Sequence, residues 1–288
     1  MTAKDESLSN NKIMQKRPLP LQRGIMVLLG LGILLIMAFY TLTDVAHLTH
    51  SHVLNGADWM GYALCHRITA RSFTIAGRQF PLCARCTGMY LGVFVVYLLL
   101  WGNGRLRRGG MPPPLILVLL MGFVALMGID GINSYLHFFP NAPHLYEPRN
   151  WLRLLTGMGT GLMMGITILP ALTQTLWRQV SYQPIIASCR ELAGVMLVAL
   201  FFALSLLSNQ DAINYVLALA STIGLLLIVL SLNVVFLLIA FRRESRAENW
   251  RQLILPLTVG LILTITELSI ISALRFNWSG TMAGLPGM

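Results

Sequence analysis

The sequence carries little charge for its length. Only 11% of its 288 residues are charged and 56% are hydrophobic, whereas roughly a quarter of the residues in soluble proteins are charged. Apolar runs recur at the length of about 17–25 residues that crosses a hydrocarbon core of ~30 Å. Because lipid offers no partners for backbone polar groups, such runs are expected to be helices. The composition excludes a soluble globular core and predicts an integral membrane protein of the all-α class.

Acidic residues are also scarce. The chain has 11 Asp and Glu but 21 Lys and Arg, which gives a formal net charge of +10. No basic stripe interleaved with aromatic residues accompanies this charge, which argues against a nucleic-acid partner. The alternating pattern of a membrane β-barrel is absent too. We therefore interpret the basic residues as topology signals in the loops between helices.

Seven membrane spans are predicted, and Gly-, Pro- and Asn-rich breaks separate them. The first run follows a long basic segment and lacks a small-x-small cleavage site, so we interpret it as an uncleaved helix rather than a signal peptide. The predicted spans are 24–40, 87–101, 114–133, 151–172, 189–207, 213–240 and 252–274. The expected organisation is a disordered cytoplasmic arm at 1–23, a transmembrane helix bundle at 24–274 and a short outer tail at 275–288.

Lysine and arginine residues set the predicted orientation in a cell (inner or plasma) membrane. With the amino terminus inside, fourteen of the 21 basic residues fall in segments on one side. Because an excess of Lys and Arg marks the cytoplasmic side, we expect the amino terminus in the cytoplasm and the carboxyl terminus outside.

Glycine and acidic residues inside the spans predict contacts between helices. Glycines recur every four residues from 157 to 165, a spacing that lets helix backbones approach closely in lipid. Asp130 and Glu267 are acids at membrane depth, where ionisable side chains are usually paired or functional. Arg153 is the expected partner of Asp130. For Glu267 we expect a hydrogen bond to a neighbouring helix, with a proton or ion path as the alternative.

Histidine and cysteine gather on the predicted outer side. All six histidines and three of the four cysteines lie in or beside the two outer loops. Cys83 and Cys86 form a C-x-x-C pair, and Cys65 and His66 precede them in the same loop. Three thiolates and an imidazole fit a Cys₃His zinc site in ligand type and number, which predicts a metal- or disulfide-stapled outer loop. Adjacent Cys and His residues do not easily both reach one ion, so the alternative fourth ligands are His47, His50 and His144.

Other chemistry is open to the same residues. Thiolates with imidazole also suit an iron–sulfur cluster, which we expect less than zinc. A disulfide or thiol-redox pair is the alternative in an oxidising compartment, although three cysteines leave one unpaired. Cys189, alone on the other side, is expected to be a small buried residue.

Six arginines fall in or beside the outer loops, where basic residues are normally disfavoured. One interpretation is structural, with each guanidinium paired to an acid or a helix-end carbonyl. The other is a pocket for phosphate, carboxylate or an anionic lipid head group, which a guanidinium fork binds through two hydrogen bonds. The residues predicted for that pocket are Arg67, Arg71, Arg85, Arg149 and Arg153.

Several of these stretches resemble one known family. They are Cys65-His66-Arg67, Arg71-Ser72-Phe73, PLCARCTGMYLG at 81–92, and the later Asp130-Gly131, Asn150, Arg153 and Thr156-Gly157. Together, over residues 60–170, they resemble the signature of the domain-of-unknown-function 2085 family of predicted multi-pass membrane proteins. The resemblance implies that the CHR and CARC elements belong to one site. It implies no activity and no catalytic residues.

The leading functional hypothesis is non-enzymatic. Zinc staples the outer loop to the bundle, and the protein serves as an accessory or assembly subunit of a larger membrane complex, in contact with membrane lipids and other subunits. No nucleophile–base or acid–base set is evident, so the catalytic residues are unknown. The alternatives are a metal- or thiol-dependent enzyme or carrier acting on an anionic lipid or quinone, and a metal transporter whose capture cluster is His47, His50 and His52.

Overall fold

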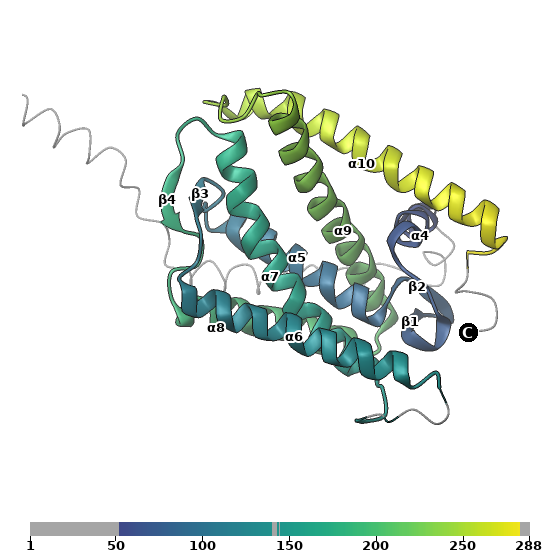
Figure 1. Cartoon of the computed structure of the whole chain (residues 1–288). Helices are drawn as coiled ribbons and strands as arrows, with labels where there is room; N and C mark the ends of the chain where they lie inside the picture. Colours follow the sequence, from purple (N-terminus) through teal and green to yellow (C-terminus); the bar gives the residue numbers. More distant parts are fainter. Residues whose placement is uncertain (1–51, 140–142, 144, 283–288) are drawn as a thin grey trace, which may run out of the picture.

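The computed structural model describes residues 52–139, 143 and 145–282 (Figure 1). Within these ranges lie seven α-helices, namely α4 (His52–Leu64), α5 (Ala84–Gly102), α6 (Pro114–Leu136), α7 (Asn150–Leu176), α8 (Cys189–Leu207), α9 (Asp211–Ala240) and α10 (Trp250–Ser279). Six of them, α5 to α10, are long and apolar enough to cross a membrane. The prediction of a polytopic helical bundle is confirmed. The predicted span at 24–40 and the arm at 1–23 lie outside the described residues.

The six described spans begin and end within five residues of the predicted boundaries. Local chemistry explains several of these ends. Pro114 opens α6, a position where its missing N–H costs no helical hydrogen bond. Ser188 caps α8 by accepting a hydrogen bond from Glu191 N at 3.3 Å, which satisfies one of the free amides of the first turn. Gly280 closes α10 with a left-handed φ of 67°, which glycine adopts without strain.

Helix α5 lies in the interior and packs against α7, α8 and α9 (Figure 1). Its closest neighbour is α7, because glycines replace side chains where the two backbones meet. A Cβ added at Gly92 would lie 2.6 Å from Met158 O, and one at Gly161 would overlap Met89 O. Small residues at this spacing allow close backbone contact in lipid. The predicted packing role of the glycine repeat is confirmed, and its partner is a helix of the same chain.

Short elements cover the bundle end at which α5, α7 and α9 begin. Helix α4 leads through a 3-10 turn, η1 (Thr69–Arg71), into an antiparallel hairpin of β1 (Ser72–Ile75) and β2 (Arg78–Cys83). The hairpin turns at Ala76 and Gly77, whose φ values of 46° and 82° are those that a two-residue type I′ turn requires. Ile75 and Phe80 are fully buried in the main core. The sequence did not predict α4 or this hairpin.

The carboxyl-terminal part of α10 holds α4 in place at this end. Ser272 Oγ donates to Trp59 O at 2.6 Å. Arg275 donates to Tyr62 O at 2.7 Å, and its guanidinium lies 4.2 Å from the centre of the Tyr62 ring. These contacts fix the segment that carries Cys65 and His66.

The opposite end of the bundle is closed by a small parallel pair, β3 (Arg108–Gly110) and β4 (Ser181–Pro184). Arg105, which is buried, makes two hydrogen bonds of 2.8 Å to the carboxylate of Glu191. This bidentate pair joins the end of α5 to the start of α8.

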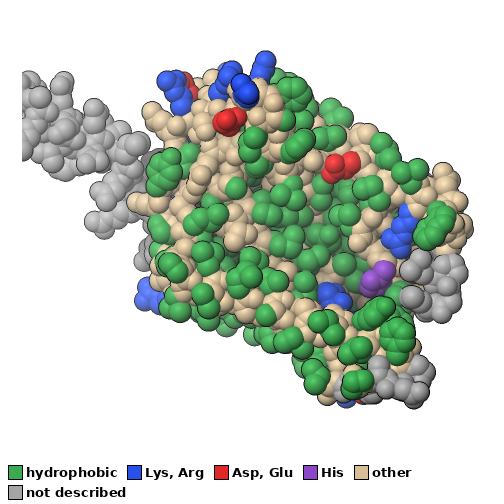
Figure 2. Space-filling model, in the orientation of Figure 1, with side chains coloured by type: hydrophobic (Ala, Val, Ile, Leu, Met, Phe, Trp, Pro, Cys, Tyr) green, Lys and Arg blue, Asp and Glu red, His purple; other side chains and the backbone are tan. Residues whose placement is uncertain are grey.

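Apolar side chains dominate the outer surface of the helices. Within the most apolar stretches of α6 and α10, only 17% of the residues are buried inside the protein. Figure 2 shows hydrophobic side chains across the face formed by α6, α7, α9 and α10, with Lys and Arg gathered mainly near the edges. Such a surface requires lipid or another apolar partner, because soluble monomers rarely expose apolar patches of this extent.

Candidate metal centre and arginine cluster

The cysteine and histidine residues of the first loop come from three adjoining elements. Cys65 follows α4 directly, and its amide donates to Gly61 O at 3.0 Å. Cys83 ends β2 and is also the N-cap residue of α5. Cys86 lies in the first turn of α5. The hairpin therefore returns the chain from Cys65 to the start of α5.

Ligand atoms of Cys65, His66 and Cys83 all lie within 4.8 Å of one another. Cys65 is 1% exposed and Cys83 is 3% exposed, while His66 is half-buried. A tetrahedral zinc ion with Zn–S bonds of about 2.3 Å places its sulfurs about 3.8 Å apart. The three groups thus fit around one ion after a small contraction. Although Cys65 and His66 are adjacent in sequence, a ligand atom of each belongs to this group.

The third thiol lies beside this group. Cys86, in the first turn of α5, is close enough to influence the pKa values of Cys65 and Cys83, but it does not belong to the group whose ligand atoms lie within 4.8 Å of one another. All four cysteines of the chain, including Cys189, are free thiols. Two thiols and one imidazole therefore form a mostly buried group with Cys86 beside it, and one disulfide would leave one of the three thiols unpaired.

Hydrogen bonds decide which thiol of the cluster ionises first. The pKa of Cys83 is held well below its usual value by hydrogen bonds with Cys65 and Cys86 and by the neighbouring His66. The same contact with Cys83 raises the pKa of Cys65 to about 12. The Cys65 sulfur accepts hydrogen bonds from Cys83 N at 3.1 Å and from Arg67 N at 3.5 Å. Because a bound metal requires deprotonated thiols, such N–H···S bonds stabilise a ligated Cys65 as well.

An arginine cluster lies beside the thiols, at the end of α6. We use this name for Arg71, Arg85 and Arg153. Arg85 forms an ion pair with Asp130 and donates to Ser134 Oγ at 3.3 Å. Arg71 donates to Ser134 O at 3.0 Å. Arg153 donates to Ser134 Oγ at 3.5 Å and, at 2.8 Å, to Asn150. Three guanidinium groups thus meet around one carboxylate and one serine.

Asp130 is 1% exposed. Its second oxygen accepts a hydrogen bond from the Tyr146 hydroxyl at 2.8 Å. The ion pair of Asp130 is with Arg85 rather than with the predicted Arg153, because Arg153 begins α7 and bonds instead to Asn150 one turn earlier. Tyr146 was missed, since it lies in an irregular segment. The position of Ser134 beside Asp130 could have been predicted, because residues four positions apart lie on the same face of a helix.

Positive charge exceeds negative charge in this cluster. The Nε atoms of Arg85 and Arg153 are buried and have no hydrogen-bond partner among the described residues. Burial, and then the charge of Arg85, lower the pKa of Arg71. Three guanidinium groups thus share one carboxylate, which leaves a net positive charge among the described side chains of the cluster.

The other predicted site residues lie elsewhere. Arg67 pairs with Asp58 at 3.1 Å, and Arg78 contacts the same carboxylate at 2.6 Å. Arg149 is the N-cap residue of α7. Of the five arginines predicted for an anion pocket, three therefore come together.

The remaining histidines contribute no further donor to the described site. His52 begins α4, and His137 lies 3.7 Å from Glu147. The alternative ligands His47, His50 and His144 lie outside the described residues.

Cys189 and Glu267 belong to neither cluster. Cys189 was expected to be buried, which is wrong: it is exposed at the first position of α8. Glu267 accepts a hydrogen bond from Asn233 Nδ2 at 2.8 Å, and the same amide donates to Thr264 at 2.9 Å. The expected contact with a neighbouring helix is confirmed, because Asn233 belongs to α9.

Comparison with known proteins places the site inside a recognised sequence family. A family model described as "Predicted membrane protein (DUF2085)" matches residues 65–167. An uncharacterized protein of Methanothermobacter thermautotrophicus is 36% identical over 84 residues, which cover 28% of this chain and 76% of that protein. An uncharacterized protein of Methanocaldococcus jannaschii is 28% identical over 116 residues, covering 40% of this chain and 68% of that protein. No solved structure matches the chain. The matched segment begins at Cys65 and contains the thiol cluster and the arginine cluster.

Proposed function

We propose that this chain, which belongs to the DUF2085 family of predicted membrane proteins, is an accessory subunit of a larger membrane complex. In this proposal a zinc ion bound by the chain joins the α4–β1 connection to the start of α5. One observation carries this proposal. Ligand atoms of Cys65, His66 and Cys83 lie within 4.8 Å of one another, and Cys86 lies in the first turn of α5, directly after Cys83 and beside this group.

The donor set favours a structural zinc ion. Three thiolates and one imidazole occupy all four positions of a tetrahedral ion, whereas catalytic zinc sites keep one position open for water or substrate. Binding energy at a closed site contributes to folding. The elements that such an ion would join, α4, β2 and α5, are short or begin at the site, so the staple would order this whole end of the bundle.

Charge balance also supports an ion at this position. Three thiolates around Zn²⁺ leave a single net negative charge, which is unfavourable in a buried site without compensation. The arginine cluster supplies that compensation, because Arg71 and Arg153 are close enough to Cys83 to interact with its charge. The remaining positive charge of the cluster would hold a phosphate or carboxylate of a lipid or of a partner subunit.

Metal analysis of the full-length protein, purified in mild detergent, tests the zinc staple. We expect about one zinc ion per chain, as in closed four-ligand sites. Cys83→Ser should lose the metal and lower the thermal unfolding midpoint. Cys189→Ser, which alters an exposed thiol at the opposite end, is the matched control and should keep both. If the analysis finds iron and acid-labile sulfide instead of zinc, the site holds an iron–sulfur cluster. If the purified protein contains no metal, the proposed zinc site is rejected.

The accessory role has a separate test. Chemical cross-linking in intact membranes, followed by native mass spectrometry, should yield the chain in a defined complex with other membrane subunits. Recovery of the chain alone, in a form that turns over a lipid or quinone, would reject the role while leaving the zinc result unaffected.

A thiol-dependent enzyme or carrier is the second candidate, and one feature favours it. Cys83 has a lowered pKa and lies at the amino terminus of α5 beside the arginine cluster, a setting typical of reactive cysteines. In that case Cys83→Ser would abolish turnover and leave the unfolding midpoint unchanged. Metal transport is less favoured, because Asp130, an acid at membrane depth that could bind a cation, is already bound to Arg85 and Tyr146.

A further inference from the structure

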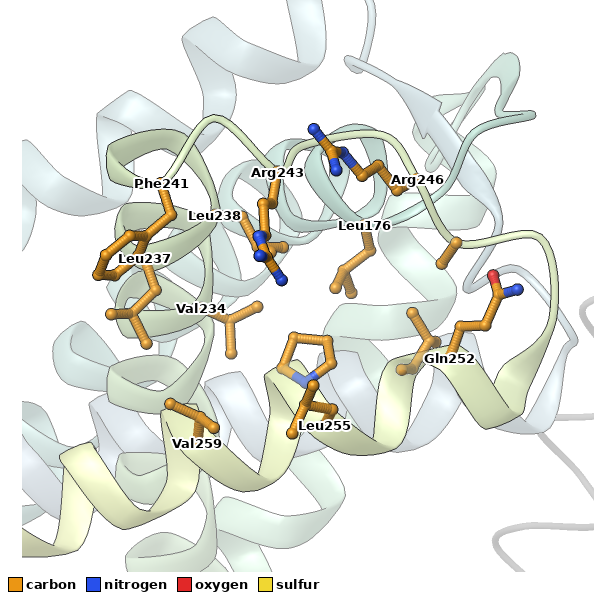
Figure 3. A pocket seen from close by; sticks show the side chains of 13 residues that line it. Leu176, Val234, Leu237, Leu238, Phe241, Arg243, Arg246, Gln252, Leu255 and Val259 are labelled. Carbon is orange, nitrogen blue, oxygen red and sulfur yellow. The ribbon is translucent and has the colours of Figure 1, made fainter.

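A large cavity lies at the bundle end opposite the thiol cluster. It has a volume of about 610 Å³ and opens between the last turns of α9 and the first turns of α10. This volume falls in the range of about 300–1,000 Å³ that is typical of ligand pockets. Figure 3 shows the side chains of Val234, Leu237, Leu255 and Val259 around it. Along the two helices the lining is therefore apolar except for Gln252 of α10.

The rim of the cavity has the opposite character. Arg243 and Arg246, in the connection between α9 and α10, complete the lining, and no acidic residue belongs to it. Figure 3 shows the Arg243 guanidinium directed into the cavity toward α10. This guanidinium makes no hydrogen bond or ion pair within the part of the chain that the structure describes. Arg246 donates one hydrogen bond, to Arg242 O at 3.0 Å, which leaves most of its donors available.

The local backbone supports this arrangement. Arg242 and Ser245 adopt left-handed φ values of 52° and 54°, so the connection folds back over the helix ends. Pro256 lines the cavity from inside α10. Because proline has no N–H, it removes one helical hydrogen bond and takes the place of a larger flexible side chain. Sequence and backbone thus both keep the space between the two helices open.

We propose that this cavity binds an anionic phospholipid, with an acyl chain between α9 and α10 and the phosphate at Arg243 and Arg246. Apolar walls require an apolar occupant, and two guanidinium groups above them require an anion. A phospholipid joins these two parts in one molecule. Basic pockets between membrane helices at a polar boundary are known to bind acidic head groups. The inference does not depend on the metal centre, which lies at the other end of the bundle.

Native mass spectrometry of the delipidated, full-length protein tests the proposal. Phosphatidylglycerol and the zwitterionic phosphatidylcholine, with identical chains, are offered in equal amounts. Each basic residue near a membrane surface strengthens anionic-lipid binding roughly fivefold, so Arg243→Gln with Arg246→Gln should reduce the preference for phosphatidylglycerol about 25-fold. Arg190→Gln, an exposed arginine at the same end of the bundle but outside the cavity, should leave the preference unchanged.

A second variant tests the apolar part of the site. Val259→Trp fills the space between the helices without changing charge, and it should reduce binding of both lipids. Equal binding of the two lipids by the unmodified protein would overturn the proposal. So would an undiminished preference for phosphatidylglycerol in the double arginine variant, because the selectivity would then come from elsewhere.

Discussion

Replacing Asp130 by asparagine tests whether one buried carboxylate holds the arginine cluster together. Asp130 forms the ion pair with Arg85 and accepts the hydrogen bond from Tyr146 at 2.8 Å. Asparagine has nearly the same size and keeps an acceptor oxygen for Tyr146. The substitution therefore removes the charge and little else, and it leaves Arg71, Arg85 and Arg153 without their shared counter-charge.

The expected loss of stability is large. Removing one partner of a buried ion pair costs about 3–5 kcal/mol. The Asp130 side chain is 1% exposed, but that of Arg85 is 23% exposed, so we expect the lower end, about 3 kcal/mol. In a protein of this size each kcal/mol lowers the unfolding midpoint by about 2–4 °C. Asp130→Asn should therefore lower it by about 6–12 °C.

Thermal unfolding of the full-length protein in lipid nanodiscs measures this shift. Asp211→Asn is the control, because Asp211 is an exposed acid at the same end that accepts a hydrogen bond of 2.8 Å from Ala76 N. Asparagine keeps an acceptor oxygen for this bond too, so the control should lose at most about 1 kcal/mol. Inorganic phosphate should restore part of the stability of Asp130→Asn, because an anion that binds only the folded state stabilises it by mass action.

A double variant makes the reasoning refutable. If Arg85→Met is combined with Asp130→Asn, the two losses should not add, and their interaction should be about 0.5–3 kcal/mol. Strict additivity, or a midpoint shift no larger than that of Asp211→Asn, would show that the carboxylate does not organise the cluster.

Three further predictions concern other parts of the chain. Gly161→Leu should prevent close packing of α5 on α7, because the new side chain would overlap Met89 O. This variant should therefore abolish recovery of folded protein. Gly122→Leu, whose new side chain would meet open space, is the control and should be recovered folded. Because the folded-state pKa of Tyr146 is raised to about 12, its stabilising contribution is complete below the ordinary pKa of about 10 and is lost as pH rises to about 12. Tyr146→Phe should weaken this loss in unfolding experiments across that window. Cys189, exposed at the bundle end predicted to be cytoplasmic, should react with a membrane-impermeant maleimide only in inverted vesicles; labelling in intact cells would reverse the orientation.

The membrane-spanning helices could be predicted because their signal is strong and local. A run such as 189–207 is apolar along its whole length, and α8 coincides with it. The hairpin of β1 and β2 gives no comparable signal. Its strands contain four and six residues, and they are stabilised by burial of Ile75 and Phe80 against distant helices. Such tertiary contributions cannot be recognised in a short sequence window.

The candidate site likewise has a part that the sequence predicted and a part that it did not. Ligand type and the C-x-x-C spacing pointed to Cys83 and Cys86, because both follow from local helix geometry at the start of α5. The partner of Asp130 did not follow from the sequence. Arg85 and Arg153 both begin helices at the same end, and only the packing of α5 and α7 against α6 decides which of them reaches the carboxylate. The side-chain pairs thus depend on helix positions that composition does not specify.

The thiol and arginine clusters should act as one unit, because the same turn of α5 serves both. In Cys83-Ala84-Arg85-Cys86, the first thiol lies with Cys65 and His66 in the candidate metal group, and the Arg85 guanidinium forms the ion pair with Asp130. A metal bound by the thiols would fix this turn and thereby the position of Arg85. Coupling between two sites is reciprocal, so chelation should weaken phosphate binding, and phosphate should strengthen metal binding by the same factor. A chelator titration with and without phosphate measures both effects in one protein, and independence of the two would show that the clusters are only neighbours.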